Sequence, residues 1–172
     1  MSGSSVEKFI NSVSFFDAFN EVEKHKFLSD QTCFVKFKEN DIVFKQGEQG
    51  DSLFLVLQGQ VGLYRLGDIK SVEGRVSLKK EEEKHITNLK SGVIFGEVSM
   101  LTNCKRNVTA RIFSKEVVLM KISKKLIDNL NHLTQIKFHR QLLLSLAIHL
   151  DNMNSQFIDL KYEHDEYVKS HS

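Results

Sequence analysis

The sequence has no proline and no tryptophan, and its only cysteines are Cys33 and Cys104. Two cysteines are too few for a disulfide framework, so we expect reduced thiols, with a single bridge between them as the minor alternative. The first eight residues lack the apolar core of a signal peptide, and no later apolar run reaches membrane-spanning length. These absences predict a cytoplasmic setting and no membrane partner.

An excess of charge of one sign is also lacking. Lys and Arg total 24 and Asp and Glu total 22, which leaves a formal net charge of +2. Such a balance gives no strong attraction to polyanions, and we expect no nucleic-acid partner. With 41% hydrophobic and 27% charged residues among 172, the chain is typical of one globular domain with a real core.

Patterns of catalytic and metal-binding residues are missing too. The seven histidines include no His-x-His pair and no pair at i and i+4, so we expect no metal. A phosphate-binding loop of the Gly-Lys-Ser type is absent, and the spacing supports no Ser/His/Asp arrangement. We therefore predict that the protein is not an enzyme and has no catalytic residue.

Glycine divides the chain into two parts, because all nine glycines lie at or before Gly96. Apolar spacing over residues 6–28 predicts short amphipathic helices, with Asp17 as a candidate cap. From 32 to 66 the apolar period changes to two, and 53–57 is a continuous apolar strand. Short strands separated by glycine turns predict an antiparallel sandwich or roll.

The later strands flank a charged segment at 67–84, for which we predict a solvated hairpin or loop, with a partner-docking loop as the alternative. Ile86 and Leu89 then resume a strand, and 108–112 and 117–122 complete the sheet. Ser123 is a candidate N-cap for a helix over 124–133. The tail from 161 to 172 is polar, and we expect it to fray.

A second C-terminal helix carries a heptad seam. Apolar residues recur in alternating steps of three and four, apart from His139 at one position: Ile136, Leu143, Leu146, Leu150, Met153, Phe157 and Leu160. We expect the first half of this helix to pack on the sheet and on a partner helix, and the second half to meet only the partner. This predicts a homodimer through a coiled coil; the alternative is a single helix folded back on its own barrel.

Residues 94–110 hold the strongest functional signal. The backbone can turn sharply at Gly96, and a helical turn can start there with free N–H groups. Those groups and Arg106 could converge on one anion, with Glu97 close by. A carboxylate beside a phosphate is useful when the ligand also offers a hydroxyl, as a ribose does. The pattern therefore favours a nucleotide.

The triplet Phe95-Gly96-Glu97, the ten positions from Gly96 to Arg106, and the following Thr109 resemble the phosphate-binding cassette of the cyclic-nucleotide-binding domain family. That family includes regulatory subunits of cyclic-nucleotide-dependent kinases, cyclic-nucleotide-gated channels and bacterial catabolite-activator-type regulators. The resemblance extends upstream through 41–47 and 53–61, and it covers roughly residues 15–160.

The resemblance implies a mainly β, α+β fold: an antiparallel β-roll (a jelly-roll-like double-stranded β-helix) with N-terminal helices, a short cassette helix and long C-terminal helices. It implies three parts: an N-terminal helical flap over 1–30, the roll with its pocket over 31–123, and lid and dimerisation helices with a frayed tail over 124–172. It also implies a regulatory sensor that relays ligand binding through closure of the C-terminal helix onto a downstream effector of unknown identity.

Site residues follow from the same resemblance. The family's acid at Glu97 binds the ribose 2′-hydroxyl, and its arginine at Arg106 pairs with the cyclic phosphate. Met153 and Asn154 match lid positions in the bacterial relatives, although Met153 fits the dimer seam equally well. The complete predicted ligand set, including backbone N–H donors at three positions, is Phe95, Gly96, Glu97, Val98, Arg106, Asn107, Val108, Met153 and Asn154.

The base preference depends on Asn107. The family commonly has alanine or serine at this position in cAMP binders and threonine in many cGMP binders, whereas asparagine can donate to a phosphate oxygen or to a guanine edge. We expect cAMP in preference to cGMP as the ligand. The alternative is a degenerate roll that binds no nucleotide and serves as a dimeric protein-interaction module.

Overall fold

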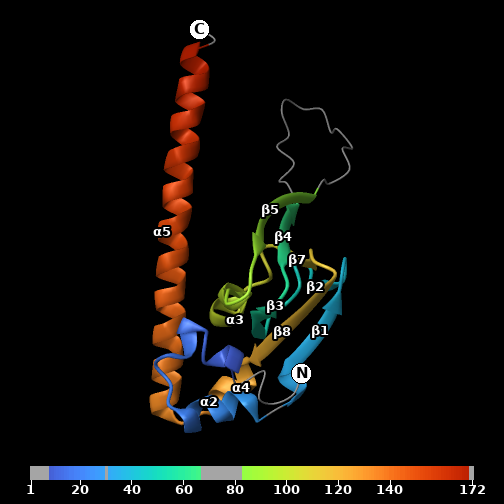
Figure 1. Cartoon of the computed structure of the whole chain (residues 1–172), viewed down its shortest axis with the longest axis vertical. Coiled ribbons are helices and arrows are strands. Elements are labelled where there is room, and N and C mark those ends of the chain that lie inside the picture. The colour runs from blue at the N-terminus through green and yellow to red at the C-terminus, as the bar shows by residue number, and fades with distance from the viewer. Residues whose placement is uncertain (1–7, 30, 67–82, 171–172) are drawn as a thin grey trace.

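The computed structural model describes residues 8–29, 31–66 and 83–170. Within them, eight strands form two four-stranded antiparallel sheets, in the orders β1-β8-β3-β6 and β2-β7-β4-β5 (Figure 1). The strands are β1 (Phe34–Lys38), β2 (Ile42–Phe44), β3 (Ser52–Gln58), β4 (Val61–Leu66), β5 (Glu83–Leu89), β6 (Ile94–Phe95), β7 (Thr109–Ile112) and β8 (Glu116–Ser123). This arrangement confirms the predicted antiparallel β-roll.

Strand β3 explains why residues 53–57 are continuously apolar. Its odd-numbered side chains from Leu53 to Leu57 join one core, shared with the helices, whereas Phe54 and Val56 join a second core inside the roll. Successive side chains of a strand point to opposite faces, so a strand between two cores needs apolar residues at every position. The charged segment at 67–84, predicted as a solvated hairpin or loop, lies almost wholly outside the described residues; β4 ends at Leu66 and β5 begins at Glu83.

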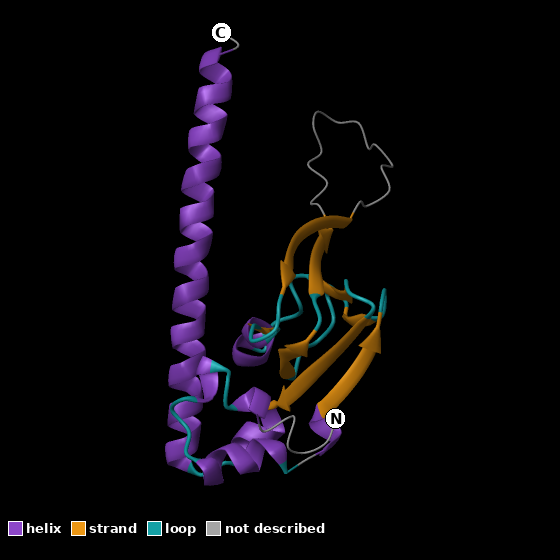
Figure 2. Cartoon of the chain, viewed as in Figure 1, coloured by secondary structure: helices purple, strands orange, loops and turns teal. Residues whose placement is uncertain are grey.

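In Figure 2 the long C-terminal helix lies to the left of the strands, and several shorter helices lie below them. The helices include the 3-10 helices η1 (Ser14–Phe16) and η2 (Gln31–Cys33) and the α-helices α2 (Glu21–Leu28), α3 (Glu97–Thr102), α4 (Lys124–Asp128) and α5 (His132–Ser170). The cap predicted at Asp17 is wrong for α2, which begins at Glu21 and has Asn20 as its N-cap. The Asn20 side chain accepts from the Glu23 amide and the Glu23 carboxylate accepts from the Asn20 amide, both at 2.9 Å, which is a capping box.

The C-terminal helices also differ from expectation. Ser123 caps α4 as predicted, accepting from the Leu126 amide at 3.2 Å, but α4 ends at Asp128 instead of 133. It stops because Leu130 turns into the core and Asn131 starts a new helix, its side chain accepting from the Thr134 amide at 2.9 Å. Helix α5 is therefore separate from α4 and begins at His132.

We expected the first half of helix α5 to pack on the sheet and on a partner helix, but α5 packs on the N-terminal helices through Phe138. Its ring stacks on Phe27 at 5.8 Å and meets Phe15 edge-on at 5.3 Å between centroids. After Leu142, no described residue of α5 is buried. The helix then runs beside the roll and projects beyond it (Figure 1). No helix in the described part of the chain is both long and apolar enough to cross a membrane.

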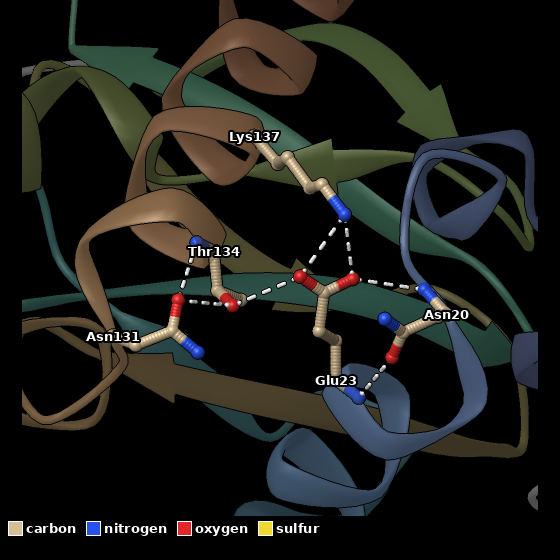
Figure 3. Close-up of polar contacts among 5 residues, drawn as sticks. All are labelled: Asn20, Glu23, Asn131, Thr134 and Lys137. Atoms are coloured by element: carbon tan, nitrogen blue, oxygen red, sulfur yellow. Dashed lines mark hydrogen bonds and ion pairs between the residues drawn. The ribbon is translucent and has the colours of Figure 1, made fainter.

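A polar cluster, the α2–α5 joint, fixes the base of α5 to α2 (Figure 3). Glu23 is only 7% exposed, and its carboxylate accepts from Lys137 at 2.8 and 3.0 Å. The Thr134 hydroxyl lies 3.0 Å from the same carboxylate. Hydrogen bonds from Lys137, from the Asn20 amide and from Thr134 lower the pKa of Glu23 and outweigh the effect of burial. The joint is an ion pair between a buried carboxylate and a partly exposed lysine, and the carboxylate has its hydrogen bonds satisfied.

Candidate functional site

Helix α3 starts from a backbone conformation that glycine adopts without strain. Gly96 has a φ of 79°, in the left-handed region, and a Cβ at this position would lie 2.7 Å from Nη1 of Arg106. Glycine is therefore required at Gly96 for two reasons, the turn and the close approach of the arginine. This geometry brings the two ends of the predicted cassette together.

Arg106 is buried, with 5% of its surface exposed, and it points into the roll. Its Nη1 donates to the Gly96 carbonyl and the Ser99 hydroxyl, each at 2.5 Å, and its Nη2 donates to the Ser52 carbonyl at 2.7 Å. These acceptors are all neutral. Among the described residues, no carboxylate forms an ion pair with the guanidinium, and its buried Nε has no hydrogen-bond partner.

The electrostatics of the guanidinium follow from that burial. Burial lowers the pKa of Arg106, while the more distant Asp51, Glu97 and Glu48 raise it in part. The Phe44 ring lies 4.1 Å from the guanidinium carbon and contributes a cation–π contact. A buried cation that has only neutral acceptors and one unused donor is suited to bind an anion.

Two hydrogen-bond partners of Arg106 were not predicted from the sequence. Ser52 lies 54 positions upstream, and Ser99 lies seven positions before the arginine, so neither matched a recognisable pattern. From the sequence, Gly50 was predicted only to lie at a turn or bulge, but a Cβ there would lie 2.6 Å from the guanidinium carbon and 2.3 Å from the Ser99 hydroxyl oxygen. Gly50 therefore makes the space that the arginine occupies.

A cavity of about 320 Å³ opens beside Arg106, within the range of roughly 300–1,000 Å³ typical of small-molecule sites. Its wall comes from the roll, the α3 cassette and α5: Phe44, Leu63, Leu89, Ile94, Phe95, Gly96, Glu97, Val98, Ser99, Arg106, Asn107, Val108, Leu146, His149, Leu150 and Met153. Burial raises the pKa of Glu97, opposed by a hydrogen bond from the backbone amide of Glu97 itself and by electrostatic effects of the nearby His149 and Arg106.

The structure brings most of the predicted ligand set together in this wall. Asn154 is the exception and is not part of the lining. It follows Met153 by one residue, which turns it about 100° around the helix and away from the roll. Phe95 lines the cavity but is mainly a core residue, with its ring stacked on Phe54 at 5.4 Å between centroids.

Other sequence predictions concern chemistry outside this pocket. Both cysteines are free thiols, Cys33 buried and Cys104 exposed, so the alternative of a bridge between them is wrong. No group of three or more metal-ligating side chains occurs among the residues that the structure describes.

The fold and the pocket together define a class of protein, a β-roll with a small-molecule site between its cassette and a C-terminal helix. A family model described as the cyclic nucleotide-binding domain matches residues 34–131, which is more than half of the chain. The chain therefore belongs to the cyclic nucleotide-binding domain family, whose members are regulatory modules.

The chain is similar to parts of longer proteins. It is 26% identical over 122 residues to a cGMP-dependent protein kinase of Eimeria tenella, covering 69% of this chain and 11% of the kinase. It is 25% identical over 109 residues to a cAMP-dependent protein kinase regulatory subunit of Blastocladiella emersonii, covering 63% and 24%. A solved cyclic nucleotide-binding domain from Methylobacillus flagellatus has a TM-score of 0.69 at 17% identity, covering 91% and 82%.

Proposed function

We propose that this domain binds a 3′,5′-cyclic nucleotide in the cavity beside Arg106, with cAMP preferred over cGMP. The observation that carries the proposal is the state of Arg106, a buried guanidinium with neutral acceptors and an unpaired Nε. A cyclic phosphate supplies the missing negative charge and an acceptor for that donor. The amides of Val98, Asn107 and Val108 are the further phosphate donors that the family resemblance predicts.

Glu97 suits the ribose side of the ligand. Its side chain lines the same cavity, and its carboxylate can accept a hydrogen bond from the 2′-hydroxyl. The raised pKa of Glu97 indicates that burial opposes the ionised carboxylate. A hydroxyl donor in the cavity stabilises that ionised form.

The preference for cAMP rests on the wall that α5 contributes. Leu146, Leu150 and Met153 are apolar, and they face the cavity opposite the cassette. Guanine carries both a carbonyl and an amino group that must lose water on burial against such a wall, whereas adenine has only the amino group. Asn107 is the lining residue that could offset this difference for guanine.

Helix α5 is the proposed lid and dimer element. The heptad seam predicted from sequence includes Leu146, Leu150 and Met153, which line the pocket, and Phe157 and Leu160, which lie beyond it. Phe157 is 69% exposed, and an apolar stripe of this length is typical of a coiled-coil surface. Closure over the ligand and pairing with a second copy therefore use one continuous stripe, and this couples binding to the regulatory output.

Calorimetric titration of cAMP and cGMP tests the proposal. We expect micromolar or tighter binding of cAMP, and a loss of about tenfold to a hundredfold in Arg106→Ala, the value of a charge-assisted hydrogen bond of roughly 1.5–3 kcal/mol. Arg111→Ala is the matched control, because Arg111 pairs with Glu83 at 2.6 Å and is not part of the cavity wall. Heat from neither nucleotide would favour the alternative, a dimeric interaction module that binds no ligand.

A further inference from the structure

The α5 wall of the pocket contains one polar side chain. Three of its four lining residues are apolar, and the fourth is His149. His149 comes seven residues after the buried Leu142 and four before Met153, so these three residues share one stripe of the helix. That stripe faces the roll. The imidazole is therefore the hydrogen-bonding group that the proposed lid brings to the ligand.

His149 also stands between two cavities. A second cavity of about 580 Å³ lies between α5 and the turn from β5 to β6, and His149 is part of the wall of both. Leu144, Ile148 and Asn152 line the second cavity from one side of the helix, whereas Leu150 and Met153 line the first from the other. His149 thus borders both spaces, and it is exposed.

Charged groups line the two cavities from several elements. Glu97 comes from α3 and Arg106 from the loop after it, and both line the first cavity together with His149. Lys90 lines the second cavity from the β5–β6 turn, while η1 contributes only the neutral Ser14 and Phe15. Glu97 is therefore the carboxylate that shares the first cavity with His149.

We infer that His149 is a ligand-binding residue that hydrogen-bonds the ribose 2′-hydroxyl, with Glu97 bonding the same hydroxyl from the other side of the cavity. A hydroxyl donates one hydrogen bond and accepts up to two, so the 2′-hydroxyl can donate to Glu97 and accept from the imidazole N–H. The inference rests on the proposed binding of a cyclic nucleotide. In this arrangement the 2′-hydroxyl connects the cassette to α5, so closure of α5 is selective for ribose over deoxyribose.

The test is a double-mutant cycle that combines removal of the His149 side chain with removal of the 2′-hydroxyl group of the ligand. Calorimetry measures the affinities of wild type and His149→Ala for cAMP and for 2′-deoxy-cAMP, with His164→Ala, an exposed histidine farther along α5, as the control. We expect His149→Ala to weaken cAMP binding by about two- to tenfold, the value of one hydrogen bond. Its affinity for 2′-deoxy-cAMP should stay equal to that of wild type, and His164→Ala should match wild type for both ligands.

Each other outcome overturns the inference. An equal loss for both nucleotides would mean that His149 acts on another part of the ligand or on the shape of α5. Unchanged cAMP binding in His149→Ala would mean that the imidazole makes no contact. Absence of binding by the wild-type protein would overturn the proposed function as well, so the two failures are distinguishable.

Discussion

Two buried charged sites in this molecule have opposite electrostatic characters. In the α2–α5 joint, Glu23 has Lys137, Thr134 and the Asn20 amide as partners, and its pKa is lowered. In the pocket, burial lowers the pKa of Arg106 and raises that of Glu97, so both groups are shifted toward their neutral forms. The joint satisfies its charges within the protein, whereas among the described residues Arg106 in the pocket has no ion-pair partner.

The difference separates a structural site from a binding site. Buried charges are ordinarily paired, because an unpaired one loses its hydration without compensation. A fold that breaks this rule at one concave position while obeying it at another marks the exception as functional. Substitutions at the two sites should therefore affect different quantities, stability at the joint and affinity at the pocket.

The largest expected effect is on stability, from Lys137→Met at the joint. This change leaves the Glu23 carboxylate buried without its cation, and breaking a buried pair in this way costs roughly 3–5 kcal/mol. Because the Lys137 side chain is 39% exposed, solvent screens the pair, and we expect a smaller loss of about 2 kcal/mol, measured as the free energy of unfolding in urea. Replacing both partners, as in Glu23→Leu with Lys137→Met, should recover much of the loss; a double variant no more stable than Lys137→Met would refute the pairing.

The next largest effect is expected at the pocket, where a substitution should reduce ligand affinity more than it reduces stability. Arg106→Met should weaken cAMP binding by at least about tenfold, because it removes a charge-assisted contact. The unliganded protein should lose less stability than Lys137→Met does, since the variant removes an uncompensated buried charge together with its hydrogen bonds to neutral acceptors. Urea unfolding and calorimetry on the same samples measure both. A stability loss as large as that at the joint would show that Arg106 is mainly structural.

The pH dependence of stability should differ in sign between the two carboxylates. Glu23 has a pKa below its ordinary value of 4.5, so its contribution is present above pH 4.5 and is lost as the pH falls through its folded pKa. Glu97 has a raised pKa, so the folded state binds its proton more tightly and lowering the pH toward 4.5 through the folded pKa adds stability.

Urea midpoints between pH 3 and pH 7 measure these slopes. Glu23→Gln should flatten the loss of stability below pH 4.5, and Glu97→Gln should remove the gain on the approach to pH 4.5 from above. Glu21→Gln, an exposed carboxylate at the start of α2 that pairs with Lys24, is the control and should change neither slope. Identical pH profiles for Glu23→Gln and Glu97→Gln would contradict the comparison.

The smallest effect on the fold is expected from Phe157→Asp on the far half of α5. Phe157 is exposed in the single chain, so the substitution should change the unfolding free energy of the monomer by no more than about 0.5 kcal/mol. It should nevertheless convert the proposed dimer to a monomer by light scattering, since a charge enters the apolar seam. Tyr162→Asp, off the seam, is the matched control. A monomer mass for wild type with and without cAMP would remove the dimer proposal.

Spacing within short segments was enough to predict much of this protein. The alternation over 32–66 predicted the strands, and Gly96, Glu97 and Arg106, which lie within ten residues, predicted the pocket. Predictions failed where two local signals competed. Asp17 and Asn20 are both good N-cap residues, but only Asn20 has a glutamate three residues later, with which it forms the capping box that starts α2.

What the sequence determined by itself is therefore local: the period of each strand and helix, the turn at Gly96 and the residues of the cassette. Only the tertiary structure decided which residues contact one another across long separations in the sequence. Arg106 finds the Ser52 carbonyl 54 positions away, and Glu23 finds Lys137 114 positions away. The physical reason is that periodicity records which face of an element is apolar, whereas the partners of a buried charge depend on how distant elements pack, which no short stretch of sequence encodes.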